Sequence, residues 1–266
     1  MTGHDPIDTS RPHPARMYDW FLGGKDNYPV DEDMARQLLE LNPLGREMAK
    51  CNRAFMHRAI RWLGANAGIH QYLDIGTGIP TEPNLHQIAQ EVSPEARVVY
   101  TDNDPIVLRH AEALLRSSPE GLTEYIQADA REPDRIVEQA GKILDFDKPV
   151  ALSLIALLHF VPDEDGAYEL VRKLLEPLAP GSYVVVSHVT GDYDPAGSDK
   201  ASELYKSKGV PLALRSREEV ARFFDGLELV EPGVSLVAEW RPELGEVVPV
   251  PGDGLIPGYV GVARKP

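Results

Sequence analysis

Apolar residues in the first quarter of the chain recur at intervals of three and four, which predicts helices with one buried face. The first of these helices carries on one face the residues Met17, Trp20 and Phe21. A second helix is predicted over 31–41, with Asp31 as its N-cap, and a third over 47–63. Residues 1–15 hold three prolines and no apolar periodicity, so we expect a flexible arm ahead of a helical cap over 16–66.

From residue 71 the pattern changes to strand, turn and helix, repeated along the chain. The expected strands are short apolar runs at 71–74, 97–101, 123–127, 149–158 and 182–188. The fourth run is almost unbroken in its apolar character, which is typical of a central parallel strand buried on both faces. Helical segments separate the strands, and such crossovers specify a parallel sheet with helices on both faces, an α/β fold.

The C-terminal part has a different pattern. Ser216, with Glu219 three residues later, forms a capping box for a helix over 217–225. Two late apolar segments, at 227–230 and 259–263, are interpreted as final strands that pair antiparallel with each other.

These segments predict one large domain over 67–266, which follows the helical cap. A polar loop at 191–197 opens an insert over 191–215. We expect this insert and the helical segment 16–63 to form a lid and a substrate wall over the carboxyl ends of the strands.

A glycine turn, Asp74-Ile75-Gly76-Thr77-Gly78, lies between the first strand and the next helix. Glycine permits positive φ and close approach of a ligand to the backbone, although two glycines alone fit an ordinary tight turn equally well. Asp102 and Asp129 follow the second and third strands, and open α/β sheets bind ligands at the carboxyl ends of their strands. Asp102 is placed to accept both ribose hydroxyls and Asp129 to meet an adenine amine, with a helix cap as the alternative for Asp129. The sequence therefore predicts an adenosine site.

The residues around the turn distinguish two classes of adenosine ligand. A dinucleotide site has a third small residue that packs the helix beneath a pyrophosphate, but this position is Thr81, between Pro80 and Pro83. Asp74 would repel a pyrophosphate, whereas it suits an ammonium and a sulfonium. The charge balance favours S-adenosylmethionine over NAD.

These motifs resemble those of a known family. The segment 73–78, Asp102 and Asp129 look like the first three motifs of class I methyltransferases, and 178–182 looks like a later turn of that class. An actinobacterial group of S-adenosyl methyltransferases, formerly a domain of unknown function, is similar in two further segments, 15–19 and 22–28. The resemblance covers almost the whole chain and implies a Rossmann-like fold with a seven-stranded, mostly parallel sheet, an antiparallel last strand and an N-terminal helical cap. Ser182 and Thr81 stand where glycines are common, which leaves the detail of the cofactor loop open.

Other residues are candidates for the same site. Asn103 is expected to contact the adenine edge through its backbone, near Asp129 and Ala130. Asp104 competes with Asp102 for the ribose, but its place before Pro105 favours a helix N-cap.

The N-terminal signature contributes candidates through the resemblance. The polar segment 25–28 is interpreted as part of a lid, with Tyr28 among the residues that bind the cofactor. Arg16 is a candidate partner of the methionine carboxylate, because a guanidinium offers bidentate geometry. An exposed turn is the alternative for the segment, since Gly, Asp and Asn all favour turns.

His159 lies just beyond the fourth strand, close to the expected position of the transferred methyl group. Histidine there is a candidate general base. His188, at the end of the fifth strand, is a second candidate, and for both residues a structural hydrogen bond to a loop carbonyl is an equal alternative.

Composition and charge narrow the function. The formal net charge of −15 argues against nucleic acid as the main partner, because phosphate contacts need clustered Lys and Arg. Cys51, the single cysteine, excludes an internal disulfide and a cysteine-rich zinc site, and no His spacing indicates a metal. The chain has no stretch of eighteen apolar residues and no secretory signal, so we expect a cytoplasmic protein that does not enter a membrane.

The leading hypothesis is a methyltransferase that uses S-adenosylmethionine and acts on a small molecule, with His159 as its base. A protein that binds the nucleoside without catalysis is an alternative, because the strand end 153–156 has no recognisable acceptor motif. An NAD-dependent oxidoreductase is a third reading. The sequence gives no information on the acceptor atom or the oligomeric state.

Overall fold

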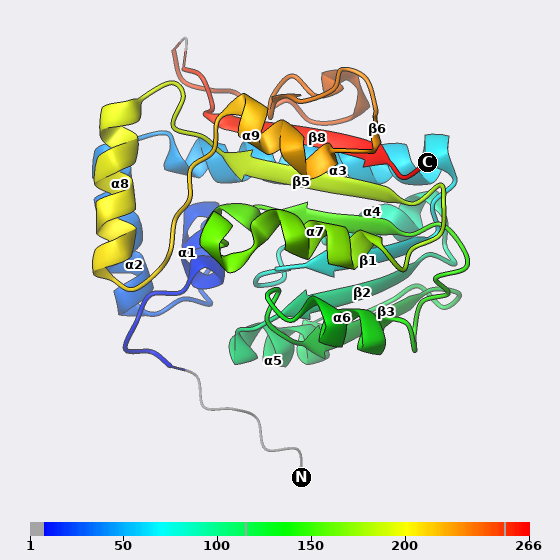
Figure 1. Cartoon of the computed structure of the whole chain (residues 1–266). Helices are drawn as coiled ribbons and strands as arrows, with labels where there is room; N and C mark the ends of the chain where they lie inside the picture. Colours follow the sequence, from blue (N-terminus) through cyan, green and yellow to red (C-terminus); the bar gives the residue numbers. More distant parts are fainter. Residues whose placement is uncertain (1–7, 115, 253) are drawn as a thin grey trace.

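The computed structural model describes residues 8–114, 116–252 and 254–266. One eight-stranded sheet forms the centre of the molecule, with the spatial order β3-β2-β1-β4-β5-β8-β6 and β7 paired to β8 (Figure 1). The first five strands are parallel, and they are β1 (Gln71–Ile75), β2 (Arg97–Asp102), β3 (Leu122–Gln127), β4 (Ala151–Ile155) and β5 (Tyr183–Val189). The parallel α/β sheet expected from the repeated strand–helix pattern is confirmed.

The antiparallel part of the sheet lies at its C-terminal edge. β8 (Gly258–Arg264) runs antiparallel to β5 on one side and to the short strands β6 (Glu228–Leu229) and β7 (Ser235–Leu236) on the other. The late antiparallel pair is therefore confirmed, and the two-residue β7 adds one strand to the seven expected. β8 is buried along most of its length, since it is covered by strands on both edges.

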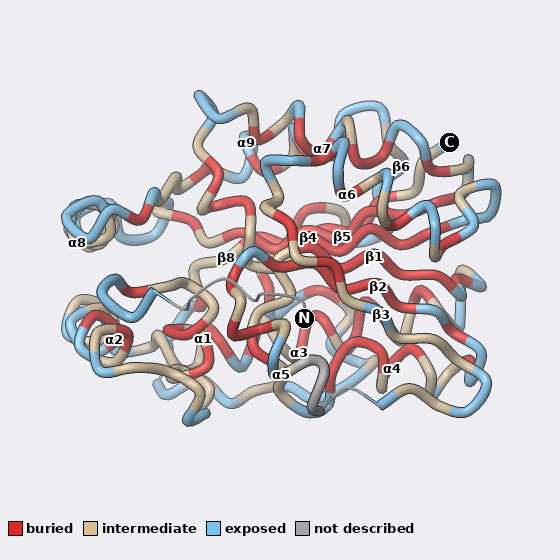
Figure 2. The backbone as a smooth tube through the Cα atoms, turned by 90° about the horizontal axis from the view of Figure 1, so that it is seen from below, coloured by how far each residue is buried: buried red, intermediate tan, exposed pale blue. Residues whose placement is uncertain are grey.

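Helices cover both faces of the sheet, as Figure 2 shows. One face carries α3 (Gly45–Ala67), α4 (Leu85–Val92) and α5 (Pro105–Leu114). The other face carries α6 (Pro133–Ala140), α7 (Ala167–Leu175) and α9 (Arg217–Ala221). Four 3₁₀ turns complete the described regular structure, namely η1 (Leu158–Phe160), η2 (Asp163–Asp165), η3 (Arg222–Phe224) and η4 (Pro242–Leu244). The capping box at the start of α9 is present, because Ser216 Oγ accepts the N–H of Glu219 and Glu219 accepts the N–H of Ser216.

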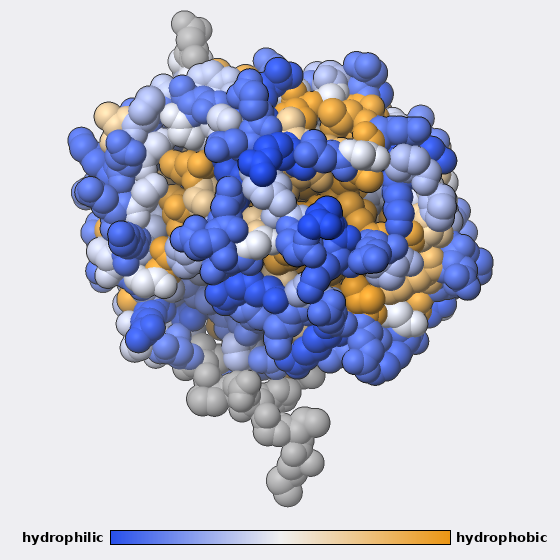
Figure 3. Space-filling model, in the orientation of Figure 1, coloured by the Kyte–Doolittle hydropathy of each residue, from blue (hydrophilic) through white to orange (hydrophobic). Residues whose placement is uncertain are grey.

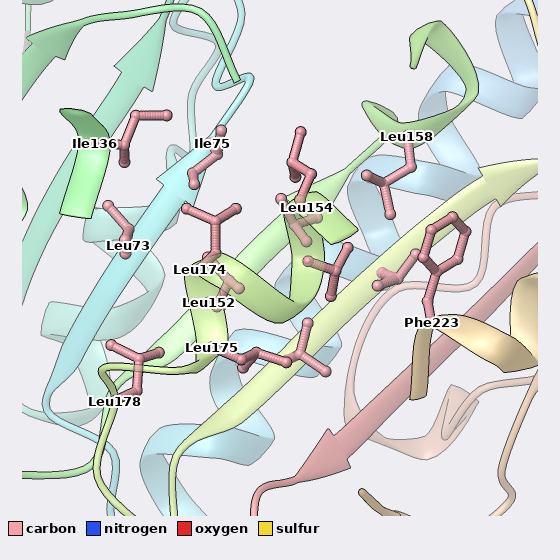
Figure 4. Packing of buried hydrophobic residues seen from close by; sticks show 14 of the residues in the cluster. Leu73, Ile75, Ile136, Leu152, Leu154, Leu158, Leu174, Leu175, Leu178 and Phe223 are labelled. Carbon is pink, nitrogen blue, oxygen red and sulfur yellow. The ribbon is translucent and has the colours of Figure 1, made fainter. Parts of the chain in front are cut away.

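The core beneath α7 consists of interdigitated branched side chains. Leucines of α7, including Leu174, point toward Leu73 of β1 and Leu152 of β4, and Phe223 closes the cluster at one end (Figure 4). These side chains are at most 7% exposed. Burial of each such side chain stabilises the fold by roughly 1.5–3 kcal/mol, so this layer fixes the strands whose ends form the site.

The N-terminal helical cap lies over the carboxyl ends of the strands and consists of α1 (Pro14–Leu22), α2 (Pro29–Leu41) and the first part of α3. The expected arm over 1–15 is wrong in its C-terminal boundary, since Pro14 begins α1, whereas residues 8–13 form no helix or strand and the His13 N–H donates to Asp31 Oδ1 at 2.8 Å. Residues 1–7 of the predicted arm lie outside the described residues.

Asp31 is also a correction. It is not the N-cap of α2, which begins at Pro29 after Tyr28. Asp31 lies one turn inside the helix, and its Oδ2 accepts the N–H of Tyr28 at 2.9 Å while Oδ1 accepts that of His13. The Asp31 carboxylate therefore links the start of α2 to the segment before α1 through two hydrogen bonds. These bonds explain why a residue type common at N-caps lies at the third helical position.

The insert between β5 and α9 contains a helix that sequence patterning did not predict. α8 (Pro195–Ser207) begins at Asp194, whose side chain accepts the N–H of Gly197 at 3.0 Å, and it lies beside α2 (Figure 1). None of the residues of α8 is buried. The expected polar loop over 191–197 therefore holds only as far as Asp194. Among the described residues, no helix is long and apolar enough to cross a membrane.

Candidate cofactor and active site

The glycine turn after β1 has two glycines in the left-handed region, for different reasons. Gly76 has φ of 72°, and a Cβ at this position would lie 2.7 Å from Leu157 Cδ1. Gly78 has φ of 70°, but the atom nearest to its hypothetical Cβ is Ala15 Cβ at 4.0 Å. Gly76 is therefore required by packing as well as by conformation, whereas Gly78 leaves open space where a ligand can approach the backbone.

Asp102 is the residue that joins this turn to the next strand. Its Oδ2 accepts the N–H of Gly78 at 2.8 Å, and its Oδ1 accepts the N–H of Asp104 at 2.9 Å. Burial raises the pKa of Asp102 above its usual value, against the opposing effects of His13 and of these two hydrogen bonds. The predicted ribose-binding carboxylate thus lies at the carboxyl end of β2, in contact with the glycine turn.

Asp104 caps α5, as predicted, because its Oδ1 accepts the N–H of Ile106 at 3.1 Å.

Asp74, at the end of β1, lies beneath the turn. Burial raises the pKa of Asp74 to about 6, while neighbouring Arg53 lowers it and Asp102 raises it further. A carboxylate in this setting gains from a cationic ligand, because a positive charge favours its ionised form.

Asp129 follows β3 and is held by Arg131. Arg131 donates to both oxygens of Asp129, through Nε at 2.9 Å and Nη2 at 2.7 Å, and Asn103 Nδ2 donates at 3.2 Å. The hydrogen bond from Arg131 lowers the pKa of Asp129 to about 2, so the carboxylate is ionised at neutral pH. The backbone N–H of Arg131 also donates to Oδ1 at 2.9 Å, so four donors match the about four lone-pair sites of the carboxylate, and an adenine amine would bind Asp129 by replacing one of them.

One cavity of about 950 Å³ connects these residues with the cap and with the insert. It is lined by the ends of β1, β2, β4 and β5, by α1, α3 and α8, and by the loop over 209–214. Eleven of the sequence-predicted residues line it, namely Arg16, Asp74, Gly76, Thr77, Gly78, Asp102, Asn103, Asp129, Ala130, His159 and His188. The predicted lid and substrate segments therefore border the same space as the glycine turn.

Tyr28, the remaining predicted residue, does not line this cavity. It packs with Ile79 and Ile106, and its ring lies 5.5 Å from the guanidinium carbon of Arg16. Tyr28 therefore packs against the guanidinium of Arg16 and is not placed to contact a ligand in the cavity.

Arg16 is buried in a cluster of charged groups. Its Nε donates to Asp104 Oδ2 at 3.0 Å, its Nη2 donates to the carbonyl of Asp8 at 3.0 Å, and Nη1 lies 3.6 Å from Asp31 Oδ2. Nη1 makes no hydrogen bond within the described part of the chain. Arg16 thus joins α1 to the start of α5, and its Nη1 is buried beside the carboxylate of Asp31.

The Gly-Gly-Lys-Asp-Asn segment is built around Asp19. Oδ2 of Asp19 accepts the N–H of Asp26 at 3.0 Å and Nδ2 of Asn27 at 2.8 Å. A Cβ at Gly24 would overlap the Asp19 carboxylate, so glycine is required there by close approach. Residues 25–28 do not line the cavity, and the structure therefore supports the turn interpretation of this segment over direct contact with the cofactor.

His159 lies in η1, just after β4, and is 8% exposed. Its Nδ1 has no hydrogen-bond partner among the described residues. Burial lowers the pKa of His159 well below 6.5, and the positive charge of nearby Arg215 acts in the same direction. His159 is therefore a neutral imidazole at neutral pH.

His188 is held in one tautomer by its two contacts. Its Nδ1 lies 2.6 Å from the carbonyl of Val189, and its Nε2 lies 2.8 Å from Arg215 Nη1, which is always a donor. Nδ1 therefore carries the proton and Nε2 accepts. The structural alternative for His188 is thus realised, and its ring lies 5.4 Å from that of His159.

Arg215 is a residue that the sequence interpretation missed. It is 3% exposed and donates to the carbonyls of Leu158 and Val161, at 2.8 Å each, and to Asp163. These bonds fix the loop that carries His159. No local signal marks Arg215, because its partners in this loop lie more than fifty residues earlier in the chain and His188 lies 27 residues earlier.

A second missed feature is a chain of hydrogen bonds on the cavity wall. Asn52 Nδ2 donates to Tyr18 Oη at 2.8 Å, and Asn52 Oδ1 accepts from Ser187 Oγ at 2.5 Å. Ser187 Oγ in turn accepts the N–H of Ala156 at 2.9 Å. Ala156 has φ of 54°, which is uncommon for a residue other than glycine, so the network holds a strained position at the end of β4.

The residues present fit S-adenosylmethionine. Gly78 leaves backbone open to the cavity, Asp102 and Asp129 supply acceptors at the ends of β2 and β3, and Asp74 supplies a carboxylate for an ammonium. They fit a dinucleotide poorly, since α4 begins at Leu85, seven positions beyond Gly78, and its N-terminus does not follow the turn directly. Within the described residues, no group of three His, Cys, Asp or Glu side chains gathers as metal ligands would.

Fold and site together define a class I methyltransferase that depends on S-adenosylmethionine. The family model described as S-adenosyl methyltransferase matches residues 1–266, and the chain therefore belongs to this family.

Solved structures agree with this assignment. A DUF574 family protein from Streptomyces avermitilis is 46% identical, with a TM-score of 0.93 over 98% of this chain and 100% of that one. A putative methyltransferase from Thermobifida fusca is 38% identical, with a TM-score of 0.86 over 97% and 96% of the two chains. A methyltransferase from Anabaena variabilis that depends on S-adenosylmethionine shares the fold at 14% identity, with a TM-score of 0.51 over 100% and 99%. No curated protein sequence matches the chain.

Proposed function

We propose that this methyltransferase acts on a small-molecule acceptor that is enclosed in the cavity beside the cofactor. The observation that carries the proposal is the continuity of the cavity, whose volume of about 950 Å³ runs from the glycine turn to α8. Pockets for drug-sized ligands span roughly 300–1,000 Å³, so this volume suits a nucleoside together with a second small molecule. The net charge of −15 also disfavours a nucleic-acid acceptor.

Residues of β1, β2 and β3 would hold the cofactor. Asp102 would accept the ribose hydroxyls and Asp129 the adenine amine, with Asn103 and Ala130 beside the ring. The buried carboxylate of Asp74 carries the charge opposite to that of an ammonium, and the guanidinium of Arg16, which lines the cavity, carries the charge opposite to that of a carboxylate.

S-adenosylmethionine supplies a methyl group on a positively charged sulfur. The chain contributes alignment and exclusion of water, because the end of β4 and η1 hold Ile155, Ala156 and Leu157 against the cavity. The N–H of Ala156 donates to Ser187 Oγ, which holds this backbone segment in place beside the glycine turn.

His159 is the candidate general base. Its lowered pKa leaves the imidazole unprotonated at neutral pH, so that it can accept a hydrogen bond from an acceptor hydroxyl and take up its proton as the methyl group is transferred. Arg215 and His188 cannot take this role, since Arg215 remains charged and both nitrogens of His188 are engaged.

The test is transfer of a deuterated methyl group. The protein is incubated with S-adenosylmethionine labelled at the methyl group and with separate panels of phenols, amines, carboxylic acids, peptides and oligonucleotides, and products are detected by mass spectrometry. The proposal predicts labelled product in a small-molecule panel, with loss of turnover in His159→Ala at unchanged binding of S-adenosylhomocysteine. Labelling of peptide or oligonucleotide alone would contradict it, and binding without any transfer would favour a non-catalytic nucleoside-binding protein.

A further inference from the structure

Charged side chains are unevenly distributed around the cavity. Along the strand order, β3, β2 and β1 lie on one side of β4, and β5 and β8 lie on the other. The N-terminal cap and the ends of β1 to β3 contribute the charged lining residues Asp8, Arg11, Arg16, Arg53, Asp74, Asp102, Asp129 and Arg131. This side matches the charged and polar groups of the cofactor.

The other side of the cavity is almost uncharged. Among the described residues between 187 and 260 that line it, Asp194 is the one with a formal charge, and its carboxylate caps α8 by accepting the N–H of Gly197. His188 is also there, but its tautomer shows a neutral ring with both nitrogens engaged. The remaining lining is largely apolar and includes Val210, Leu212 and Ile256.

Arg53 lies close to the boundary and does not supply a charge to the apolar side. It donates to the carbonyls of Thr81 and Pro83, and it lies near enough to Asp74 to lower the pKa of that carboxyl. Its guanidinium thus belongs to the cofactor side of the cavity.

Aromatic side chains from two different elements meet on the apolar side. Phe160 of η1 and Tyr205 of α8 have ring centroids 5.9 Å apart. Both residues line the cavity. Figure 3 shows hydrophobic surface between polar side chains on the α8 side of the molecule.

We propose that the methyl acceptor is an uncharged, largely apolar molecule, seated between η1, α8 and the first residues of β8. This inference rests on the proposed function and names the substrate class of that site. An ionised group on this part of the acceptor would lose its hydration without an oppositely charged partner, which is costly. A ring with a hydroxyl would pack against Phe160 and Tyr205 and present its polar atom toward His159.

The test compares three related probes on the protein saturated with S-adenosylhomocysteine. They are 2-naphthol, its 6-carboxylate and its 6-aminomethyl derivative, which are neutral, anionic and cationic at pH 7. Calorimetric titration should give a dissociation constant for 2-naphthol at least about tenfold lower than for either charged probe. A dissociation constant for a charged probe that is equal to or lower than that for 2-naphthol would overturn the proposal.

Leu212→Asp places a carboxylate in the apolar wall, and Leu229→Asp makes the same change on β6, where the leucine is 43% exposed and outside the cavity. The proposal predicts that Leu212→Asp weakens 2-naphthol binding by at least about tenfold, whereas Leu229→Asp leaves it unchanged. Equal effects of the two variants would overturn it. Titration with S-adenosylhomocysteine alone tests the cofactor site separately from the acceptor class. If S-adenosylhomocysteine does not bind, the cofactor site is contradicted and the acceptor class is not.

Discussion

The carboxylate of Asp102 accepts the backbone N–H of Gly78 at 2.8 Å, across the carboxyl ends of β2 and β1. The second oxygen accepts the N–H of Asp104 at 2.9 Å. The glycine turn is therefore held in its open conformation by the same side chain that is placed to bind the ribose. Such preorganisation reduces the cost of ordering the site when the cofactor binds.

The two glycines of the turn should respond differently to alanine. Both variants incur roughly 1–2 kcal/mol for the left-handed conformation, but Gly76→Ala also places a methyl group 2.7 Å from Leu157 Cδ1, which adds roughly 1–3 kcal/mol. Urea denaturation should show the larger loss of stability for Gly76→Ala. Gly78→Ala should instead lose affinity for S-adenosylhomocysteine out of proportion to its stability, because its methyl group enters the cavity. Equal stability losses with unchanged affinity in Gly78→Ala would contradict this assignment.

Binding of S-adenosylhomocysteine should strengthen as Asp74 ionises. The pKa of Asp74 is raised to about 6, chiefly by burial, so the carboxyl is largely neutral at pH 5 and ionised above pH 7. The ligand ammonium prefers the ionised form, and affinity should therefore rise about tenfold between pH 5 and pH 7. Calorimetry on Asp74→Asn should show a flatter profile. The same rise in the variant would exclude Asp74 as its origin.

His188 should make the fold less stable in acid. Burial lowers its pKa to about 3, so between pH 6.5 and pH 3 the unfolded chain binds a proton that the folded chain does not. The contribution of neutral His188 to the free energy of unfolding is therefore fully present above pH 6.5. It decreases as the pH falls, by on the order of 2 kcal/mol at pH 5. Urea denaturation at pH 7.5 and pH 5 should show a smaller decrease for His188→Asn than for the wild type. His70→Asn, at a half-exposed histidine, serves as the control and should keep the wild-type decrease.

Asn27 is expected to stabilise the fold and not to bind the cofactor. Its side chain donates to the buried carboxylate of Asp19, and Asn27→Ala removes this bond and leaves one acceptor less satisfied, which costs roughly 1–3 kcal/mol. Affinity for S-adenosylhomocysteine should not change, because Asn27 does not line the cavity. Lys25→Ala, in the exposed part of the same segment, should change neither property. A loss of affinity in Asn27→Ala without a loss of stability would restore the lid interpretation.

The sheet could be predicted from the sequence because its strands are short apolar runs separated by turns, and because a glycine turn and carboxylates mark their ends. α8 could not, since none of its residues is buried and an amphipathic pattern arises only where a helix buries one face. Asp31 was misplaced for a related reason. Its partner His13 lies on another segment, so an acidic residue in the first turn of α2 looked like the cap itself.

The chemistry of the site was predictable where it depends on one local motif, as at the glycine turn and Asp102. It was not predictable where it depends on long-range pairs. Arg215 contacts the loop of His159 across more than fifty positions, and Asn52 meets Ser187 across 135. Only folding brings these groups together, and a single sequence carries no record of such contacts.

The most direct test of the account is calorimetric titration of the wild-type protein and Asp102→Ala with S-adenosylhomocysteine and, separately, with NAD. The account predicts that the wild type binds S-adenosylhomocysteine and not NAD, and that Asp102→Ala loses at least about tenfold in affinity while remaining folded by circular dichroism. Tighter binding of NAD, or no binding of S-adenosylhomocysteine to the wild type, would contradict it.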